Sequence, residues 1–383
     1  MQKKLIALAV AGLMSGAAFA QTSVTVGGKF DACYSFSRTQ ANDTDGNMIG
    51  TKESVDGGCN STSRISIGAK EEIAKGYDIR VDFDIRFGNV HEGKNAATTG
   101  GLNSNDKKAM AFTTPFGTLQ WGVANLASNE YKLAEKPYMV TPKDTELVKF
   151  GVSQFREESL TNRNTTYWSP TFNLGPIKTL VKATYANGDN QKAGANDADA
   201  VSSGNVFVIG SEGVVMDGIV DWGFDVTDVR PSAQQSGAAG LGRNFTHAYL
   251  NIRPIPGNKN LKFSTAYNVY KGASALEGYY KEKNTNFVVA YNFNGKAEVG
   301  LGISHLNDLG SGPTGRNSGK SIMVGGSYFL SKSVQVYANL QKTDFARQEA
   351  LANGKYVGTG ANFSGGATKA DATTVKVGIM KEF

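Results

Sequence analysis

Short stretches of alternating apolar and polar residues recur along most of the chain. From Val24 to Phe36 an apolar or small residue stands at every even position, and from Tyr77 to Phe87 an apolar residue stands at every odd position. Successive side chains of a β-strand point to opposite faces, so each stretch predicts a strand with one apolar face and one polar or charged face. The pattern predicts sixteen strands, at residues 22–37, 61–73, 77–90, 107–114, 117–125, 162–171, 177–187, 204–211, 217–228, 244–252, 259–270, 284–293, 296–306, 320–330, 333–343 and 372–383.

The connections between these strands separate a membrane barrel from a soluble sandwich, which also alternates because one face of each strand is buried. Here short turns and long polar segments alternate, and aromatic residues such as Tyr34 and Phe293 lie near strand ends on the apolar face. Both features are typical of outer-membrane barrels. We therefore predict an all-β fold, a sixteen-stranded antiparallel transmembrane β-barrel with short periplasmic turns and long extracellular loops. The long connections are 38–60, 91–106, 126–161, 188–203, 229–243, 271–283, 307–319 and 344–371.

The N-terminus indicates export. Lys3 and Lys4 precede an apolar stretch, and Ala18-Phe19-Ala20 forms a small-residue cleavage site. This arrangement predicts a cleaved signal peptide at residues 1–20, because its apolar part is too short to span a bilayer. Residues 21–383 would then form a single barrel domain in the bacterial outer membrane. No later stretch approaches 18 consecutive apolar residues, so the sequence predicts no transmembrane helix.

The charge distribution and the small number of histidines argue against nucleic-acid and metal partners. The 40 Lys and Arg exceed the 34 Asp and Glu only slightly, and the excess is spread along the chain, so we expect no nucleic-acid partner. His91, His247 and His305 lie far apart in the sequence, and we expect no metal site and no cofactor.

Cys33 and Cys59 are the only two cysteines. An even number of cysteines in an exported protein favours a disulfide, which would tether the first long loop. The alternative, a reactive thiol or a metal ligand, lacks a nearby histidine in the sequence.

Five segments carry a family resemblance, and they run in order from the first strand to the last. They are SVTVGGKFDA at 23–32, SRISIGAKE at 63–71, FGTLQWG at 116–122, YWSPTF at 167–172 and VKVGIMKEF at 375–383. Together these segments resemble the general porins of β-proteobacteria. The resemblance implies a homotrimer of sixteen-stranded barrels whose third long loop folds into the lumen. It also implies that the terminal Phe383 belongs to the signal for insertion by the barrel-assembly machinery.

The chain departs from this family at two places. Val123 stands where the family usually has arginine, and Met380 and Glu382 stand where basic residues often flank the terminal Phe. Both departures remove cations, so the sequence leaves the sign of the ion selectivity open.

Alternation assigns many charged residues to the inward face of the barrel. A charged side chain that faces hydrocarbon costs about 2–4 kcal/mol near the bilayer centre, so these residues require a wet interior. As the family's constriction loop, residues 126–161 would bring acids across from Arg64, Arg80 and Arg86, and the opposed charges would set up a transverse field. In the alternative, the strand charges pair with their neighbours and brace the wall, and both can hold. The candidate pore residues are Lys29, Asp31, Arg64, Lys70, Asp78, Arg80, Asp82, Asp84, Arg86, Arg163, Lys178 and Lys182 on strands, and Glu130, Glu135, Asp144 and Glu146 on the loop.

These observations predict an outer-membrane porin for passive diffusion of small hydrophilic solutes and ions, and not an enzyme. A barrel-shaped hydrolase would need a histidine beside a serine or an acid at an outward or rim position, whereas His305 falls on the lipid-facing parity. A substrate-specific channel would show a row of aromatic residues along the lumen, where we expect only Trp168 and Tyr337. A receptor or adhesin that acts through the long loops stays open as an alternative.

Overall fold

The computed structural model describes residues 23–42, 45, 47–56, 63–87, 102–103, 107–124, 162–186, 205–230, 243–253, 260–274, 278–308, 317–347 and 369–383. Their strands are β1 (Ser23–Asn42), β2 (Met48–Asp56), β3 (Arg64–Ala74), β4 (Tyr77–Phe87), β5 (Leu102–Asn103), β6 (Lys108–Thr114), β7 (Gly117–Ala124), β8 (Asn162–Trp168), β9 (Phe172–Leu174), β10 (Ile177–Ala186), β11 (Asn205–Val215), β12 (Val220–Arg230), β13 (Arg243–Ile252), β14 (Leu261–Ser274), β15 (Gly278–Phe293), β16 (Ala297–Asp308), β17 (Asn317–Ser331), β18 (Val334–Arg347) and β19 (Lys369–Glu382). A 3-10 helix, η6 (Met216–Gly218), joins β11 to β12. None of the described segments is a helix long and apolar enough to cross a membrane.

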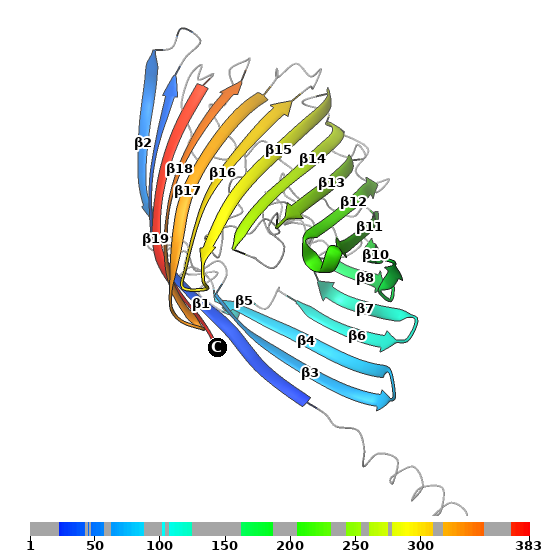
Figure 1. Ribbon diagram of the computed structural model, residues 1–383. Helices are drawn as coiled ribbons and strands as arrows, with labels where there is room; N and C mark the ends of the chain where they lie inside the picture. The colour runs from blue at the N-terminus through cyan, green and yellow to red at the C-terminus, as the bar shows by residue number, and fades with distance from the viewer. Residues whose placement is uncertain are drawn as a thin grey trace, which may run out of the picture.

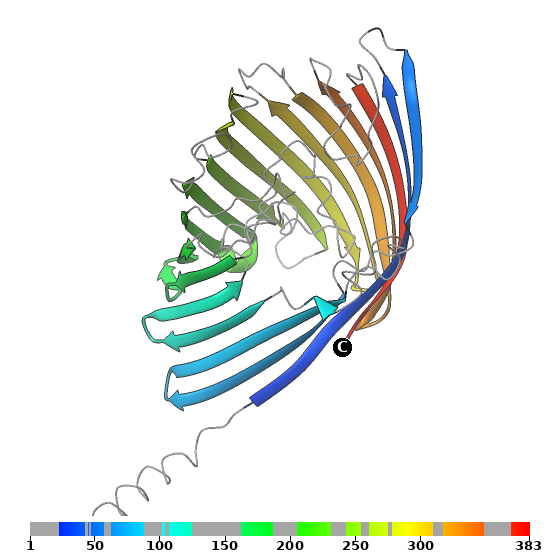
Figure 2. The same ribbon diagram turned by 180° about the vertical axis from the view of Figure 1, so that it is seen from behind.

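The strands form one closed antiparallel barrel, seen from two sides in Figures 1 and 2. Strands that follow one another in the chain pair along the sheet, and β1 closes the ring by pairing with β19. Three positions around the ring hold two segments each: β2 and β3 both pair with β1, β5 and β6 with β4, and β8 and β9 with β10. The nineteen segments therefore make sixteen barrel strands, which confirms the predicted fold.

The two faces of the barrel have opposite chemistry. Val24, Phe30 and Leu301 are exposed on the outer face, whereas Asn268 and Asn286 are buried on the inner face. A water-soluble protein would bury its large apolar side chains and expose its amides. This inside-out pattern is the one that a surrounding bilayer stabilises, because lipid covers the apolar face while the polar face lines the lumen.

Short turns close the hairpins at one rim of the barrel. In the turn between β15 and β16, Asn294 and Gly295 both have positive φ, 55° and 76°. Asn and Gly tolerate this region better than other residues, which suits them to the three-residue turn that joins Phe293 to Ala297. The long connections predicted at the opposite rim lie mostly outside the described residues.

Several strands extend further toward the long-loop rim than the alternation predicts, although β4 ends at Phe87, before the predicted residue 90. Strand β1 ends at Asn42 instead of residue 37, β15 begins at Gly278 instead of residue 284, and β18 ends at Arg347 instead of residue 343. Beyond the apolar band both faces of a strand are polar, so the alternation disappears. The backbone hydrogen bonds nevertheless continue, since they do not depend on the side chains.

The terminal residue joins the seam between the first and last strands. The Gly28 amide donates to the Phe383 carbonyl at 2.9 Å, and the Phe383 amide donates to the Gly28 carbonyl at 3.1 Å. Phe383 is 59 % exposed, and its ring lies on the outer face beside the backbone of Gly28. Phe383 therefore completes the barrel wall at the short-turn rim.

Candidate functional site: the inner wall of the barrel

Strands β3 and β4 place a block of charged side chains on the inward face. In the ladder, Lys70 lies opposite Arg80, and Glu72 lies opposite Asp78. The next inward positions along β4 are Asp82 and Asp84, which face Gly68 and Ser66. Because only small residues stand across from these two aspartates on β3, longer basic side chains have room to reach Asp82.

Ion pairs connect this block of charges. The Lys70 ammonium lies 2.9 Å from an Asp78 carboxylate oxygen. Asp82 accepts from both the Arg80 guanidinium, at 3.0 Å, and the Lys107 ammonium, at 2.7 Å. The charges therefore brace the wall between β3, β4 and the start of β6, as one of the two sequence hypotheses proposed.

In the Lys70–Asp78 and Arg80–Asp82 ion pairs, the basic side chain is more exposed than the acidic one. The side chains of Lys70 and Arg80 are 54 % and 49 % exposed, whereas those of Asp78 and Asp82 are 21 % and 20 % exposed. A long, flexible side chain keeps its charged head in water while its stem covers the neighbours. As a result, Lys70 and Arg80 extend their positive charge into the space inside the barrel further than their acidic partners do, while the exposed Glu72 of the same block adds a negative charge near the short-turn rim.

Asp31, Lys29 and Arg64 face inward on the neighbouring strands but differ in exposure. Asp31 is fully buried; it accepts a 2.8 Å hydrogen bond from the Tyr337 hydroxyl, and its amide donates to the Ser63 hydroxyl at 2.9 Å. It therefore holds the seam together and does not present its charge to the lumen. Lys29 and Arg64 lie opposite each other and are half-buried.

The ladder does not support the pore-lining prediction for Arg163. Position 163 pairs with Val123, which in turn pairs with Lys108, and all three have outward parity. The prediction is wrong because polar residues occupy both faces of β8, as in Asn164 and Thr165, so the alternation gives no parity there. The outward position of Val123 also means that the missing family arginine does not remove a charge from the lumen.

Several other predicted residues lie where their side chains are not described. Arg86 pairs with Arg64 on the inward register, but its side chain is outside the described set. Glu130, Glu135, Asp144, Glu146 and Cys59 also lie outside the described residues.

A buried polar row on the opposite wall was missed by the sequence analysis. His247 Nδ1 lies 2.9 Å from an Asp225 carboxylate oxygen, and both side chains are fully buried. Asn268 and Asn284 continue the same row across β14 and β15. The apolar residues Trp222, Phe224 and Val226 could have placed Asp225 on the inward face, although Gly223 weakens the alternation there.

Strand β13 also corrects the expectation about aromatic residues in the lumen. Phe245 and Tyr249 face inward, in addition to Trp168 and Tyr337. The pattern on β13 is hard to interpret from sequence because aromatic residues lie on the same face as His247 and Asn251.

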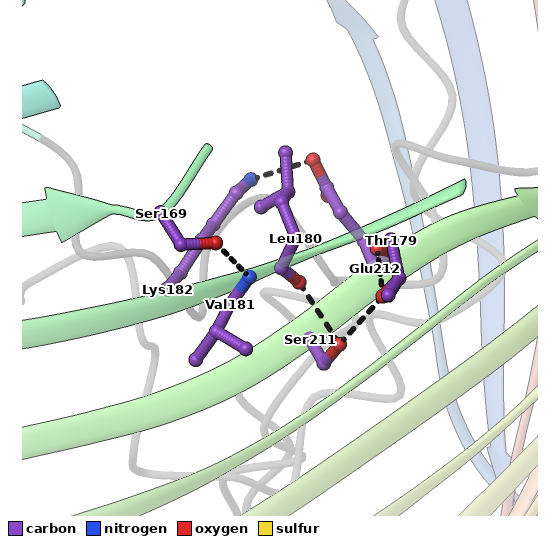
Figure 3. A network of polar contacts seen from close by, with 7 residues as sticks. All are labelled: Ser169, Thr179, Leu180, Val181, Lys182, Ser211 and Glu212. Atoms are coloured by element: carbon purple, nitrogen blue, oxygen red, sulfur yellow. Dashed lines mark hydrogen bonds and ion pairs between the residues drawn. The ribbon is translucent and has the colours of Figure 1, made fainter. Parts of the chain in front are cut away.

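Strands β10 and β11 are joined by both an ion pair and hydroxyl hydrogen bonds (Figure 3). On the inner face, the Lys182 ammonium lies 3.0 Å from a Glu212 carboxylate oxygen, and the Lys182 side chain is 4 % exposed. On the outer face, the Ser211 hydroxyl donates to the Leu180 carbonyl at 2.9 Å and lies 3.1 Å from the Thr179 hydroxyl. These hydroxyls satisfy one another and the backbone, so they are compatible with a lipid-facing surface.

Ser169 continues this network into the interval between β8 and β9. Its hydroxyl accepts from the Val181 amide at 2.9 Å, and its own amide donates to the Val181 carbonyl at 2.9 Å. The side chain thus supplies a hydrogen bond where the regular ladder is interrupted (Figure 3).

The buried ion pair predicts a measurable loss of stability in Lys182→Met. The substitution removes a cation that lies 3.0 Å from the Glu212 carboxylate in a buried position, and because Glu212 retains partial exposure we expect the free energy of unfolding to fall by about 2 kcal/mol. Urea unfolding of the folded protein in lipid vesicles measures this change. The double variant Lys182→Met/Glu212→Gln should recover part of the loss. Equal stability of Lys182→Met and the unaltered protein would contradict the prediction.

Comparisons with known proteins agree with this architecture. The family model described as Gram-negative porin matches residues 7–348. The anion-selective porin from Comamonas acidovorans has a TM-score of 0.66 at 18 % identity, covering 95 % of this chain and 100 % of that chain. OmpT of Vibrio cholerae in a trimer form has a TM-score of 0.65 at 13 % identity, covering 94 % and 99 %. OmpF of Salmonella typhi, in complex with daunomycin, has a TM-score of 0.56 at 13 % identity, covering 94 % and 97 %. The comparison with curated proteins gives no match.

Proposed function

The chain belongs to the Gram-negative porin family, and from this premise we propose that the charged wall of β3 and β4 lines the path of the small hydrophilic solutes and ions that pass through it. The protein is a passive outer-membrane channel. The observation that carries the proposal is the half-exposed state of Lys70 and Arg80 on the inward face of a barrel whose outer face is apolar. Charged groups at membrane depth are stable only where water reaches them.

Planar-bilayer recording tests the proposed conduction. The purified, folded protein should give discrete ion-permeable steps, and a KCl gradient should give a reversal potential that reports the selectivity. Folded protein that never produces such steps would contradict the proposal. Closure in groups of three would support a homotrimer, the assembly named for the Vibrio cholerae OmpT structure.

A constriction formed by residues 126–161 is the second element of the proposal. The inward side chains of Val206, Val208 and Phe245 are apolar and at most 3 % exposed. Apolar side chains facing a lumen are stable when other protein atoms cover them. We assign that role to the loop between β7 and β8, with Glu130, Glu135, Asp144 and Glu146 as its candidate acids. Shortening this loop should raise the single-channel conductance, and unchanged conductance would argue against the assignment.

Cys33 and Cys59 complete the proposal as a disulfide in the exported protein. The chain has only these two cysteines, Cys33 is buried, and no free cysteine occurs among the described residues. The bond would tether the first long loop to β1. Under denaturing, non-reducing conditions a maleimide reagent should add no mass, and it should add two labels after reduction. Labelling without reduction would contradict the disulfide.

We also propose that the protein is exported and inserted into the outer membrane as the family resemblance implies. Cleavage after residue 20 should leave a mature N-terminus at Gln21, which mass spectrometry of the protein from outer membranes can check. We propose that Phe383, at the closing seam, is part of the signal that the barrel-assembly machinery reads.

A further inference from the structure

Three polar side chains lie together on the inner face where β3 and β4 approach the long-loop rim. Arg64 begins β3, Ser66 follows two residues later, and Asp84 lies directly opposite Ser66 on β4. The two strands lie side by side in both views of the barrel (Figures 1 and 2). All three side chains are half-buried, and we call them the β3–β4 corner.

The corner differs from the rest of the charged wall in how its polar groups are used. Lower on the wall, Lys70 pairs with Asp78. Asp82 accepts from both Arg80 and Lys107. Within the described part of the chain, by contrast, no side chain of the corner has an ion-pair or side-chain hydrogen-bond partner. The corner therefore keeps charge and hydrogen-bonding capacity that a solute in the lumen can use.

The two charges of the corner are diagonal neighbours in the ladder. Arg64 lies opposite Arg86, two positions from Asp84, and diagonal neighbours of an antiparallel pair are about 7–8 Å apart. The Asp84 amide donates to the Lys107 carbonyl at 2.9 Å, which fixes the backbone of β4 at this point. The corner thus presents a guanidinium and a carboxylate on neighbouring strands, with the Ser66 hydroxyl across from the carboxylate.

The charges around the corner determine which solute it suits. On the other side of Arg64, Lys29 of β1 lies directly opposite and is also inward-facing and half-buried. A simple cation drawn to Asp84 therefore approaches two positive side chains. A simple anion drawn to Arg64 approaches the Asp84 carboxylate. Because the approach of like charges disfavours a ligand, a solute that carries one charge of each sign fits the corner better than either.

We propose that the β3–β4 corner binds the zwitterionic group of a free α-amino acid on its way through the channel. The carboxylate of the amino acid accepts two parallel hydrogen bonds from the planar Arg64 guanidinium. Its ammonium group, on the neighbouring carbon atom, donates to the Asp84 carboxylate and to the Ser66 hydroxyl. The inference rests on the proposed function, because it names a solute class for one part of the proposed channel wall.

A binding measurement with three probes tests this site. The purified full chain, folded in detergent at low ionic strength, is titrated with alanine, with propionate as the carboxylate alone, and with propylammonium as the ammonium alone. Saturation-transfer NMR reports each dissociation constant, and it suits a site that a diffusing solute must leave again. We expect alanine to have a dissociation constant about threefold lower than either single-charge probe, since each partly exposed ion pair adds a modest free energy.

Two variants separate the roles of the two charges. Asp84→Asn should remove the advantage of alanine over propionate, whereas Arg64→Gln should weaken the binding of both. The controls Asp344→Asn and Arg38→Gln remove the same charges from exposed positions on the outer face and should bind all three probes as the unaltered protein does. The heat-dependent shift on electrophoresis confirms that all four variants are folded.

Two results would overturn this proposal. One is equal binding of alanine and propionate by the unaltered protein, which would leave an anion site only. The other is an advantage of alanine that survives in Asp84→Asn. Bilayer recordings in KCl without added solute keep the two proposals apart. Ion-permeable steps together with either result would refute the amino-acid site alone, whereas folded protein without steps would refute the channel.

Discussion

Replacing Gly28 with alanine will prevent normal closure of the barrel. A Cβ atom at this position would lie 2.4 Å from the Arg64 carbonyl oxygen and 2.8 Å from the Phe383 ring. Relief requires movement of the β3 backbone and of the terminal residue, which exchanges two hydrogen bonds with Gly28. Overpacking of this kind costs about 3 kcal/mol. We expect a large loss of the folded fraction on refolding into detergent, measured by the heat-dependent shift on electrophoresis.

Gly68→Ala is the matched control for this prediction. Gly68 lies on the neighbouring strand β3, and a Cβ atom there would meet its nearest neighbours at 3.6 and 4.0 Å, which is ordinary contact. The control should therefore fold as the unaltered protein does. If Gly28→Ala folds as well as Gly68→Ala, the seam does not need the close approach described for Phe383.

Removing the two exposed cations of the β3–β4 wall should shift the ion selectivity toward cations. In Lys70→Gln/Arg80→Gln, Asp78 and Asp82 lose their ion-pair partners on these strands and become the dominant charges at this point of the wall. The sign of charge around a narrow aqueous path decides which ion it favours. We expect the ratio of chloride to potassium permeability to fall by about twofold or more, as reported by the reversal potential in a KCl gradient.

Two further variants distinguish the effect of where a charge lies from the effect of the net charge of the protein. Asp78→Asn/Asp82→Asn should move the reversal potential in the opposite direction. Lys296→Gln/Lys332→Gln removes the same charge as the lysine–arginine variant but from exposed turn positions, and it should change the selectivity little. A similar shift from the turn variant would show that the overall charge, and not the inner wall, determines selectivity.

Alternation predicted the strands and most of their faces because the bilayer imposes it on every strand that crosses. It placed Asp78, Arg80 and Asp82 on the inward face, where the ladder has them. It failed at Arg163 because both faces of β8 carry polar residues, so the sequence does not distinguish the inward face from the outward face there. Alternation therefore predicts the facing of a residue only on strands where one face is apolar.

Properties that depend on side-chain length and on neighbouring strands could not be predicted in this way. The sequence gives Lys70 and Asp78 equal and opposite charges, but the longer lysine extends into the lumen while the aspartate stays near the wall. Likewise, the contact between Asp225 and His247 depends on the register of two strands whose alternation is interrupted by Gly223 and Thr246. The exposure of a charged side chain and its choice of partner depend on the register between strands and on side-chain length. Neither can be read from the alternation within one strand.

The hydrogen bond from Tyr337 to Asp31 joins residues that are 306 positions apart in the chain. Such a contact forms only after most of the polypeptide has been delivered, and long-range pairings of this kind make folding slow. Until β19 arrives, β1 presents an unpaired edge that can associate with other chains. The closing seam therefore makes assembly depend on the last strand to emerge, and it places the period of greatest aggregation risk before that strand is in place.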